Sequence, residues 1–344
     1  MEPLSTNNSH AALIGVGAFL PPRRISNEDL AERMDTTDEW ITTRTGIRAR
    51  HWADPGIATS DLAVEAGHRA LKSARLTAEP GAVDAVVLAT TTPDHPCPAT
   101  APQVAARLGL GTAAAYDVAA VCTGFLYALA TASAQIVAGH ARRVLVIGAE
   151  TYSTLLNPAD RTTNVIFGDG AGAVVLEATS EADRPGVLLG VDLGSDGTRH
   201  TLITVAAGGS RQRSTPGAPD PDAHYFAMDG KKVFAQAVTR MAGSCAKVLE
   251  RVGWTTDEVD HLVGHQANLR ILHALSRQLG VPQRRAVVHL DQVGNTSAAS
   301  VPLALADAAG RGTLGVGDRV LLTAFGGGLT WGAAALRWPD VVPA

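Results

Sequence analysis

Val83-Asp84-Ala85-Val86-Val87-Leu88 and Val259-Asp260-His261-Leu262-Val263 are the two short apolar stretches that decide the fold. Each has the length and the apolar content of a buried strand. Each also follows a segment with helical periodicity, around 62–76 in the first case and 238–252 in the second. The chain therefore starts the same helix–strand pattern twice.

The pattern continues in the same order after both stretches. The first is followed by a helix at 101–108 that stops at Gly109, a strand end near Asp117, a helix start near Cys122, and strands at 143–148 and 173–177. The second is followed by a helix at 269–279 that stops at Gly280, then Asp291, a helix start near Asn295, a strand at 319–322 and the segment 332–338. This alternation predicts parallel sheets covered by helices, and its repetition predicts an α/β fold built from two duplicated halves. We expect the halves to be residues 1–184 and 185–344.

The composition predicts a cytoplasmic globular protein that binds neither nucleic acid nor membrane. Hydrophobic residues make up 46% of the 344 residues and charged residues 18%, which is enough apolar surface for a large core. The net charge of −4 gives no sign of nucleic-acid binding. The apolar segment 11–20 is short and ends at a Pro-Pro pair, so it indicates a buried strand and not a signal peptide. No stretch reaches the eighteen or so apolar residues that a membrane span needs.

The three cysteines, Cys97, Cys122 and Cys245, do not form a disulfide framework, because their number is odd and their spacing wide. This pattern fits a reducing compartment. The chain has no Cys-x-x-Cys motif and no Cys/His cluster, so the sequence predicts no metal site.

Three residues with chemically useful side chains lie at related points of the repeat. Cys122 follows a strand end and opens a helix, where the positive end of the helix dipole favours a thiolate and lowers the pKa of the thiol. Asn295 is at the matching place in the second half, and His265 lies just beyond the strand at 259–263. Each alone has an ordinary structural explanation: an inert buried cysteine, a core histidine, a helix N-cap. Together they predict one catalytic centre.

Two glycine-rich stretches lie beside strands near this centre, at 167–173 and 324–330. Glycine lets the backbone approach a ligand closely, and an N–H of the Gly326–Gly328 turn can join that of Cys122 as an oxyanion hole. Neither stretch has the spacing of a phosphate-binding loop. The segment from Trp40 to Arg50 combines an indole with three arginines, which suits stacking on adenine and binding of phosphates, although such a run is more often a solvated turn.

These motifs resemble those of β-ketoacyl-acyl carrier protein synthase III, the initiating condensing enzymes of type II fatty acid synthesis in the thiolase superfamily. The matching stretches run through nearly the whole chain: WITTRTGIRAR at 40–50, DVAAVCTGF at 117–125, FGDGAGA at 167–173, HQANLR at 265–270, NTSAASVPL at 295–303 and FGGGLTWGA at 325–333. The resemblance implies a thiolase-like five-layered αβαβα fold and a homodimer.

The resemblance also implies a reaction in which Cys122 takes an acyl group from coenzyme A as a thioester. His265 and Asn295 then donate hydrogen bonds to the thioester carbonyl of malonyl-acyl carrier protein while carbon dioxide leaves. The resulting enolate attacks the acyl group on Cys122, whose oxyanion is held by the N–H groups of Cys122 and Gly327. Coenzyme A enters as part of the substrate, and neither a metal nor another cofactor is implied.

The family pattern assigns further residues to the substrates. It places Trp40 and Arg44 at the adenine, and Arg161, Gly230, Phe234 and Asn268 along the rest of coenzyme A. Arg270 and Arg277 match basic positions that meet the acidic carrier protein, and Lys231 or Lys232 substitutes for a basic position that is Ala235 here. Cys97, Tyr152 and Phe167 fall at the acyl pocket, with Cys97 supplied to the partner subunit's pocket.

Two positions depart from the pattern at the acyl pocket, because Cys97 is smaller and Tyr152 larger than the residues common there. The length of the primer therefore stays open. A priming synthase or acyltransferase of a polyketide pathway is the nearest alternative, and a non-catalytic acyl-CoA-binding protein is the alternative from another class. Thiolases need a second cysteine in the C-terminal glycine motif, which Ala324–Gly328 lacks.

Overall fold

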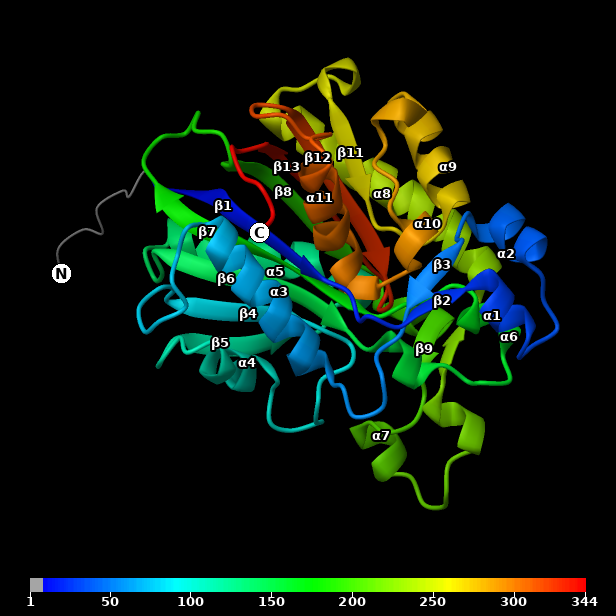
Figure 1. Cartoon of the computed structure of the whole chain (residues 1–344). Helices are drawn as coiled ribbons and strands as arrows, with labels where there is room; N and C mark the ends of the chain where they lie inside the picture. The colour runs from blue at the N-terminus through cyan, green and yellow to red at the C-terminus, as the bar shows by residue number, and fades with distance from the viewer. Residues whose placement is uncertain (1–8) are drawn as a thin grey trace.

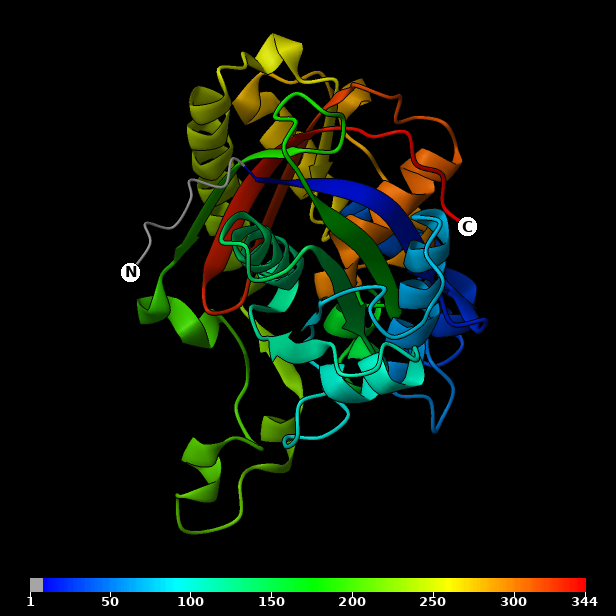
Figure 2. The same ribbon diagram turned by 90° about the vertical axis from the view of Figure 1, so that its left-hand side faces the viewer.

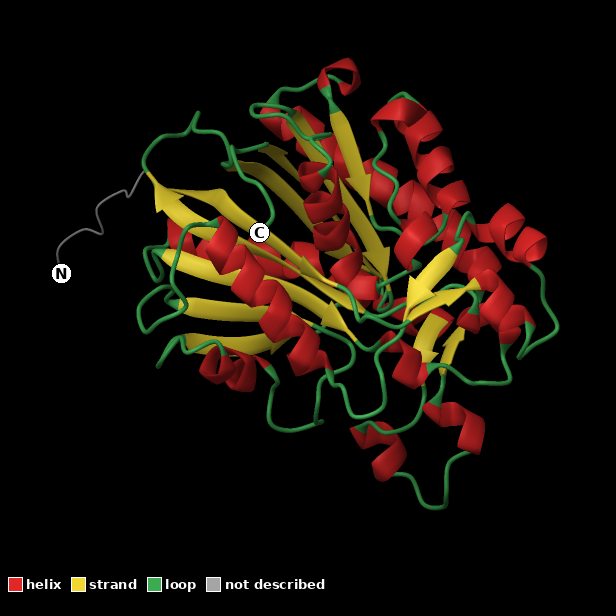
Figure 3. Cartoon of the chain, viewed as in Figure 1, coloured by secondary structure: helices red, strands yellow, loops and turns green. Residues whose placement is uncertain are grey.

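Two β-sheets with the same strand order lie at the centre of the structure, a computed structural model that describes residues 9–344 (Figures 1 and 3). The first sheet has the order β1-β7-β6-β4-β5, from strands β1 (His10–Phe19), β4 (Ala85–Ala89), β5 (Ala114–Val118), β6 (Arg143–Glu150) and β7 (Gly170–Thr179). The second has the order β8-β13-β12-β11, from strands β8 (Leu188–Ser195), β11 (His261–Gly264), β12 (Arg319–Gly326) and β13 (Thr330–Arg337).

The strand directions match as well as the order. In the first sheet β7 is antiparallel to β1 and β6, while β4 is parallel to β6 and β5. In the second, β13 is antiparallel to β8 and β12, and β11 is parallel to β12. A single parallel bridge between Leu262 and Ala286 stands where a counterpart of β5 would lie. The sheets are therefore two copies of one topology, as the repeat predicted.

Helices form three layers around the two sheets, which makes five layers in all (Figures 1 and 2). Helices α3 (Thr59–Ser73) and α4 (Ala101–Arg107) cover the outer face of the first sheet, and α8 (Gly230–Val252) and α9 (Leu269–Leu279) that of the second. Helices α5 (Gly124–Val137) and α11 (Ser300–Gly310) lie between the sheets and contact both. The five-layered αβαβα arrangement is confirmed.

The remaining elements are short and lie outside these layers. They are β2 (Arg24–Ser26), α1 (Asn27–Ala31), α2 (Asp38–Thr45), β3 (Ala49–His51), α6 (Arg161–Asn164), β9 (Ile203–Val205), α7 (Ser210–Arg213), β10 (Phe226–Met228) and α10 (Leu290–Val293). Single 3-10 turns are η1 (Val121–Thr123), η2 (Tyr152–Leu155), η3 (Gly197–Leu202), η4 (Pro221–His224), η5 (Thr256–Glu258), η6 (Gln283–Arg285) and η7 (Ser297–Ala299). Figure 1 shows the segment around α7 as an excursion that extends away from the sheets.

The two halves share their largest hydrophobic cluster, which contains residues from both sheets and from α5 and α11. Small side chains allow this close packing. A Cβ atom on Gly148 of β6 would lie 2.4 Å from the carbonyl oxygen of Ala298, so only glycine fits there. The predicted boundary between residues 184 and 185 falls between β7, in the first sheet, and β8, in the second. Because the two halves share one hydrophobic core, their division into two domains stays a prediction.

Two details of the predicted repeat are wrong. The helix expected to start near Asn295 is α11, which begins at Ser300, and the turn η7 precedes it. Asp291, expected in the place of the strand residue Asp117, lies in the short helix α10. Within residues 9–344, no helix is both long and apolar enough to cross a bilayer.

Candidate active site

Cys122 lies in η1, between the end of β5 and the start of α5. The preceding residue, Val121, has a φ of 47°, a left-handed conformation that is uncommon for a β-branched residue. The glycine-rich turn after β12 presses against this point, because a Cβ atom on Gly326 would lie 2.8 Å from the backbone nitrogen of Cys122. Gly327, in the same glycine-rich turn as Gly326, lies next to the side chain of Val121. The predicted oxyanion-hole residues thus meet at the nucleophile.

His265 follows the last residue of β11, and its backbone N–H donates to the carbonyl oxygen of Thr323 at 2.8 Å. The ring is buried, and burial lowers the pKa of His265 to about 3, so the imidazole is neutral at neutral pH. Its Nδ1 lies 2.6 Å from the hydroxyl of Ser300, the first residue of α11. The histidine is therefore held by a helix of the middle layer.

The backbone of Asn295 is fixed to the start of the first glycine-rich stretch. Its N–H donates to the carbonyl oxygen of Ile166 at 2.8 Å, and its own carbonyl oxygen accepts from the N–H of Gly168 at 3.0 Å. Its side-chain oxygen accepts from the N–H of Ser297 at 2.9 Å. Since that bond occupies the amide oxygen, the amide NH₂ group is left to donate toward a substrate.

One enclosed cavity of about 40 Å³ brings the three side chains together. Its lining includes Cys122, His265 and Asn295, which are 8%, 4% and 5% exposed. The rest of the lining is almost wholly apolar. The three residues line one shared cavity, and the catalytic centre that the sequence predicted from them stays a prediction.

Three aromatic rings form one wall of this cavity. Tyr152 stacks on Phe167 with ring centroids 4.5 Å apart, and Phe226 meets both rings edge-on at 5.3 and 4.9 Å. Tyr152 and Phe167 were expected at an acyl pocket. Phe226 was not, and neither was Met228; both lie in β10, at the base of the excursion around α7.

The environment of the Cys122 thiol differs from the expectation. Burial raises the pKa of this thiol to about 12, with a further increase from the nearby carboxylate of Glu150, while a hydrogen bond with Ser297 lowers it. The predicted lowering of the pKa at a helix N-terminus is wrong for the free protein. The physical cause is that the sulfur lies in an apolar cavity, where burial disfavours the charged thiolate.

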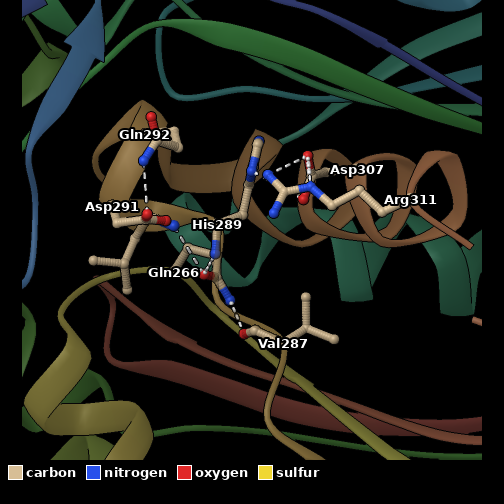
Figure 4. Close-up of polar contacts among 8 residues, drawn as sticks. Gln266, Val287, His289, Asp291, Gln292, Asp307 and Arg311 are labelled. Atoms are coloured by element: carbon tan, nitrogen blue, oxygen red, sulfur yellow. Dashed lines mark hydrogen bonds and ion pairs between the residues drawn. The ribbon is translucent and has the colours of Figure 1, made fainter. Parts of the chain in front are cut away.

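A network around Gln266 links the histidine segment to the asparagine segment. The amide NH₂ group of Gln266 donates to the carbonyl oxygens of Gly264 and Val287 at 2.8 and 3.1 Å. Its amide oxygen accepts from the N–H groups of His289 and Leu290, at the start of α10. Figure 4 shows Gln266 between these two segments. The buried amide therefore fixes the loop that follows His265 against the helix that leads to Asn295.

The same view contains the side chain of His289, which points away from Gln266 toward α11 (Figure 4). Its Nδ1 lies 3.3 Å from a carboxylate oxygen of Asp307, which also pairs with Arg311 at 3.0 Å. These polar contacts join α11 to the loop before α10.

The comparisons with known proteins cover nearly the whole chain. Residues 116–197 match the profile described as 3-oxoacyl-[acyl-carrier-protein] synthase III, and residues 249–338 match the profile of its C-terminal part. A β-ketoacyl-[acyl-carrier-protein] synthase III of Streptomyces coelicolor is 60% identical over 96% of this chain and 97% of its own length. The chain belongs to the 3-oxoacyl-[acyl-carrier-protein] synthase III family.

Solved structures agree with this assignment. The crystal structure of a 3-oxoacyl-(acyl carrier protein) synthase III from Pseudomonas aeruginosa superposes with a TM-score of 0.89 at 50% identity, over 97% of this chain and all of that one. A priming β-ketosynthase of the R1128 polyketide pathway superposes with a TM-score of 0.90 at 34% identity, over 99% of each chain. The synthase III fold predicted from the motifs is confirmed.

The residues that the synthase III pattern assigns to coenzyme A fall into two groups on the structure. Arg44 and Arg161 lie over the ring of Trp40, with guanidinium carbons 4.4 and 5.2 Å from its centroid. Asn268, the N-cap of α9, donates to the carbonyl oxygen of Arg44 at 3.1 Å. These four residues form one surface cluster, whereas their role in binding coenzyme A stays a prediction.

The second group lies on the first turns of α8, where Gly230 begins the helix and Phe234 is 38% exposed. Val233 and Ala237 of the same helix line the cavity, so α8 connects the surface to the site.

The four predicted carrier-protein residues are exposed on α8 and α9. Arg270 donates to the carbonyl oxygen of Thr43 at 2.9 Å, and Lys232 pairs with Asp229 at 2.9 Å. Arg277 lies in the last turn of α9 and Lys231 in the first turn of α8. Cys97 is exposed and lies outside the cavity lining of its own chain, so its expected place in a partner's pocket stays a prediction.

Proposed function

We propose that this protein catalyses the decarboxylative Claisen condensation of an acyl-CoA primer with malonyl-acyl carrier protein, which gives a 3-oxoacyl-acyl carrier protein and initiates fatty acid or related polyketide synthesis. The observation that carries the proposal is the single apolar cavity lined by Cys122, His265 and Asn295. A thiolate is both a good nucleophile and a good leaving group, which suits two successive acyl transfers.

In the first half-reaction, the sulfur of Cys122 attacks the primer thioester and coenzyme A leaves. The N–H groups of Cys122 and Gly327 stabilise the oxyanion in this proposal, which is supported by the close packing of the Gly326–Gly327 turn against Val121 and Cys122. We assign Trp40, Arg44, Arg161, Gly230, Phe234 and Asn268 to coenzyme A. The acyl chain lies against the wall formed by Tyr152, Phe167 and Phe226.

In the second half-reaction, His265 and Asn295 donate hydrogen bonds to the malonyl thioester carbonyl while carbon dioxide leaves. A neutral imidazole donates through Nε2 when Nδ1 is an acceptor. The contacts of Ser300 favour that tautomer: its hydroxyl accepts weakly from the N–H of Gln266 at 3.5 Å, which leaves its own hydrogen for Nδ1 of His265. Two hydrogen-bond donors suffice to stabilise an enolate, so no metal is needed.

Acidic carrier protein docks on Arg270, Arg277, Lys231 and Lys232 in this proposal, since these basic side chains are exposed on the two helices beside the cavity. The enzyme acts as a cytoplasmic homodimer, in which Cys97 reaches the pocket of the partner subunit.

Intact-mass measurement after incubation with acetyl-CoA and a panel of longer acyl-CoAs tests the proposal. One acyl group is expected on the wild-type protein and none on Cys122→Ser. Addition of malonyl-acyl carrier protein should then release a 3-oxoacyl product from the wild type. His265→Ala and Asn295→Ala should still acylate, yet lose at least about 10²-fold in condensation. A wild-type protein that takes up no acyl group from any acyl-CoA would refute the proposal.

Priming of a polyketide pathway is the second candidate, favoured by the likeness to the R1128 priming β-ketosynthase. Both candidates use the same chemistry. To separate them, kcat/KM is measured with malonate attached either to the carrier protein of fatty acid synthesis or to that of a polyketide cluster. The carrier protein that gives the higher value indicates the pathway.

A further inference from the structure

Glu150 is a fully buried carboxylate beside the nucleophile, and the reaction described above does not use it. It is the last residue of β6 and has no exposed surface. It accepts hydrogen bonds from the N–H of Thr91 at 3.0 Å, the hydroxyl of Thr92 at 2.9 Å and the hydroxyl of Ser297 at 3.0 Å. Among the described residues, all of its hydrogen-bond partners are uncharged. A carboxylate is costly to bury without a cation, so its presence calls for an explanation.

Ser297 connects this carboxylate to the reacting sulfur. Its hydroxyl donates to Oε1 of Glu150 at 3.0 Å, and the same hydroxyl lowers the pKa of the nearby Cys122 thiol. The turns η1 and η7, which carry Cys122 and Ser297, pack against each other. Cys122, Ser297 and Glu150 therefore lie in one group of neighbouring side chains that comes from both halves of the fold.

The backbone at Ser297 supports a role beyond packing. Its φ is 48°, close to the 47° of Val121, and each of the two residues begins the 3-10 turn of its half. Strained conformations of this kind are kept where the surrounding structure needs a side chain in one direction. At Val121 the strain precedes the nucleophile; at Ser297 it directs the hydroxyl between sulfur and carboxylate.

We propose that Glu150 accepts the proton of the Cys122 thiol through the hydroxyl of Ser297 when the enzyme is acylated. The inference rests on the proposed function, and it assigns the base for the first half-reaction. Glu150 acts through Ser297 and does not touch the substrate.

The protons and bonds balance over both half-reactions. In acylation the S–H bond of Cys122 breaks, its proton passes to Ser297 and the hydroxyl proton of Ser297 passes to Glu150. The sulfur bonds to the acyl carbon, and coenzyme A leaves as a thiolate that takes a proton from water. In condensation the enolate displaces Cys122 as a thiolate, which recovers the stored proton from Glu150 by the reverse path. One proton is consumed overall, as the loss of carbon dioxide from a carboxylate requires.

The electrostatics of the site agree with this sequence. Burial raises the pKa of Glu150 to about 7, so the carboxylate is basic enough to take a proton near neutral pH. The negative charge of Glu150 raises the pKa of Cys122, which means that thiolate and carboxylate disfavour each other, so the thiol becomes a thiolate more readily once Glu150 has taken a proton. The other titratable group close to both is the Tyr152 hydroxyl, whose pKa burial raises well above its ordinary value and which stays neutral.

The test compares the two half-reactions in Glu150→Gln and Ser297→Ala. Rapid-quench mass spectrometry should show acylation by acetyl-CoA slowed by about 10²-fold in both variants, the usual contribution of a general base. Condensation by enzyme that has first been fully acylated in a long incubation should change by less than about threefold. Glu150→Asp should recover part of the acylation rate, because it keeps the carboxylate.

The pH profile gives a readout that a purely structural role would not change. The acylation rate of the wild type should rise with pH through about 7, as Glu150 loses its proton, and this inflection should vanish in Glu150→Gln. The rate of iodoacetamide addition to Cys122, followed on its peptide by mass spectrometry, should fall in the same variants. That rate does not depend on coenzyme A binding or condensation.

Asp169→Asn is the matched control, since Asp169 is also fully buried and accepts from Ser153 and from the N–H of Ala53, without contact to Cys122. It should leave the iodoacetamide rate within about twofold of wild type. The proposal is overturned if the wild type acylates and Glu150→Gln acylates equally fast, or if the variants slow both half-reactions alike, as displacement of the Asn295 turn would. A wild type that never acylates would instead refute the proposed function itself.

Discussion

Tyr152 occupies the end of the cavity that we assign to the acyl group of the primer. The ring is 1% exposed and stacked on Phe167, so it is held rigidly and takes up space that a longer acyl chain would need. A cavity of about 40 Å³ has room for only a few water molecules. At the scale of single residues, we therefore expect Tyr152 to limit the length of the primer.

Replacing Tyr152 by leucine should open the pocket. We expect kcat/KM for four- to six-carbon acyl-CoAs to rise at least about tenfold relative to acetyl-CoA, the effect of one or two methylene groups in an apolar pocket. Tyr152→Phe keeps the ring and should leave the ranking of primers unchanged. An unchanged ranking in Tyr152→Leu would show that other residues set the limit.

The buried carboxylate also affects stability. Because the pKa of Glu150 is raised from about 4.5 to about 7 in the folded protein, the native state holds a proton that the unfolded chain has already released. Its contribution to stability is present below about pH 4.5 and is lost as the pH rises through about 7. The free energy of unfolding of the wild type, relative to Glu150→Gln, should therefore fall by roughly 3 kcal/mol between pH 4.5 and pH 8. Urea titrations at both pH values measure this difference, and a flat difference would contradict it.

At the scale of elements, replacing glycine by alanine should stabilise the protein in helix α8 and destabilise it in strand β6. Gly243 is exposed in the interior of α8, and a Cβ atom there meets nothing within 4 Å. Gly243→Ala should stabilise the protein by about 0.5–1 kcal/mol, since alanine has the higher helix propensity. Gly148→Ala places its Cβ atom 2.4 Å from the carbonyl oxygen of Ala298 and should cost about 1–3 kcal/mol by overpacking.

Activity separates the two glycine variants further. Ala298 is the neighbour of Ser297, so Gly148→Ala should also slow acylation, whereas Gly243→Ala should leave it unchanged. Urea unfolding and the acylation assay are the measurements. A stabilising effect of Gly148→Ala would mean that the backbone at Ala298 can move to make room for the added methyl group.

Most elements could be predicted from the sequence, because strands such as β4 and helices such as α9 show clear periodicity and clear ends. The starts of α5 and α11 could not be predicted, since each is preceded by a 3-10 turn that begins with a left-handed residue, Val121 or Ser297. Neither valine nor serine signals that conformation. The short strands β9 and β10 were missed for another reason: they pair only with each other, beside a polar excursion.

At the scale of the molecule, Cys97 is expected to act across the dimer. It is exposed in its own chain, in the loop before α4. Cys97→Phe should reduce the use of primers longer than acetyl, because a larger ring would enter the pocket of the partner subunit. Relative kcat/KM across the primer panel measures the effect, with Cys97→Ser as a control of similar size. Equal values for all primers would refute it.

The shared location of Cys122, His265 and Asn295 could be predicted because the repeat placed three reactive residues at related points of the two halves. Glu150 and Ser297 could not, since their importance lies in contacts between the two halves that no periodicity reveals. The pKa of Cys122 was mispredicted for the same reason: the sequence shows the helix that follows the cysteine, but not the apolar lining that β10 and α8 bring to it.

The shared core has a consequence for how this protein is made. Helix α11 covers the inner face of the first sheet, and α5 contacts β13, the last strand of the second sheet. A ribosome that has finished residue 184 still has more than a hundred residues to add, which takes on the order of 10 s. During that time α5 already packs on the inner face of the first sheet, but the part over β1 and β7 lacks the cover that α11 later provides. Nascent chains stalled before α11 should therefore bind chaperones or aggregate, even though every strand of their first sheet is already present.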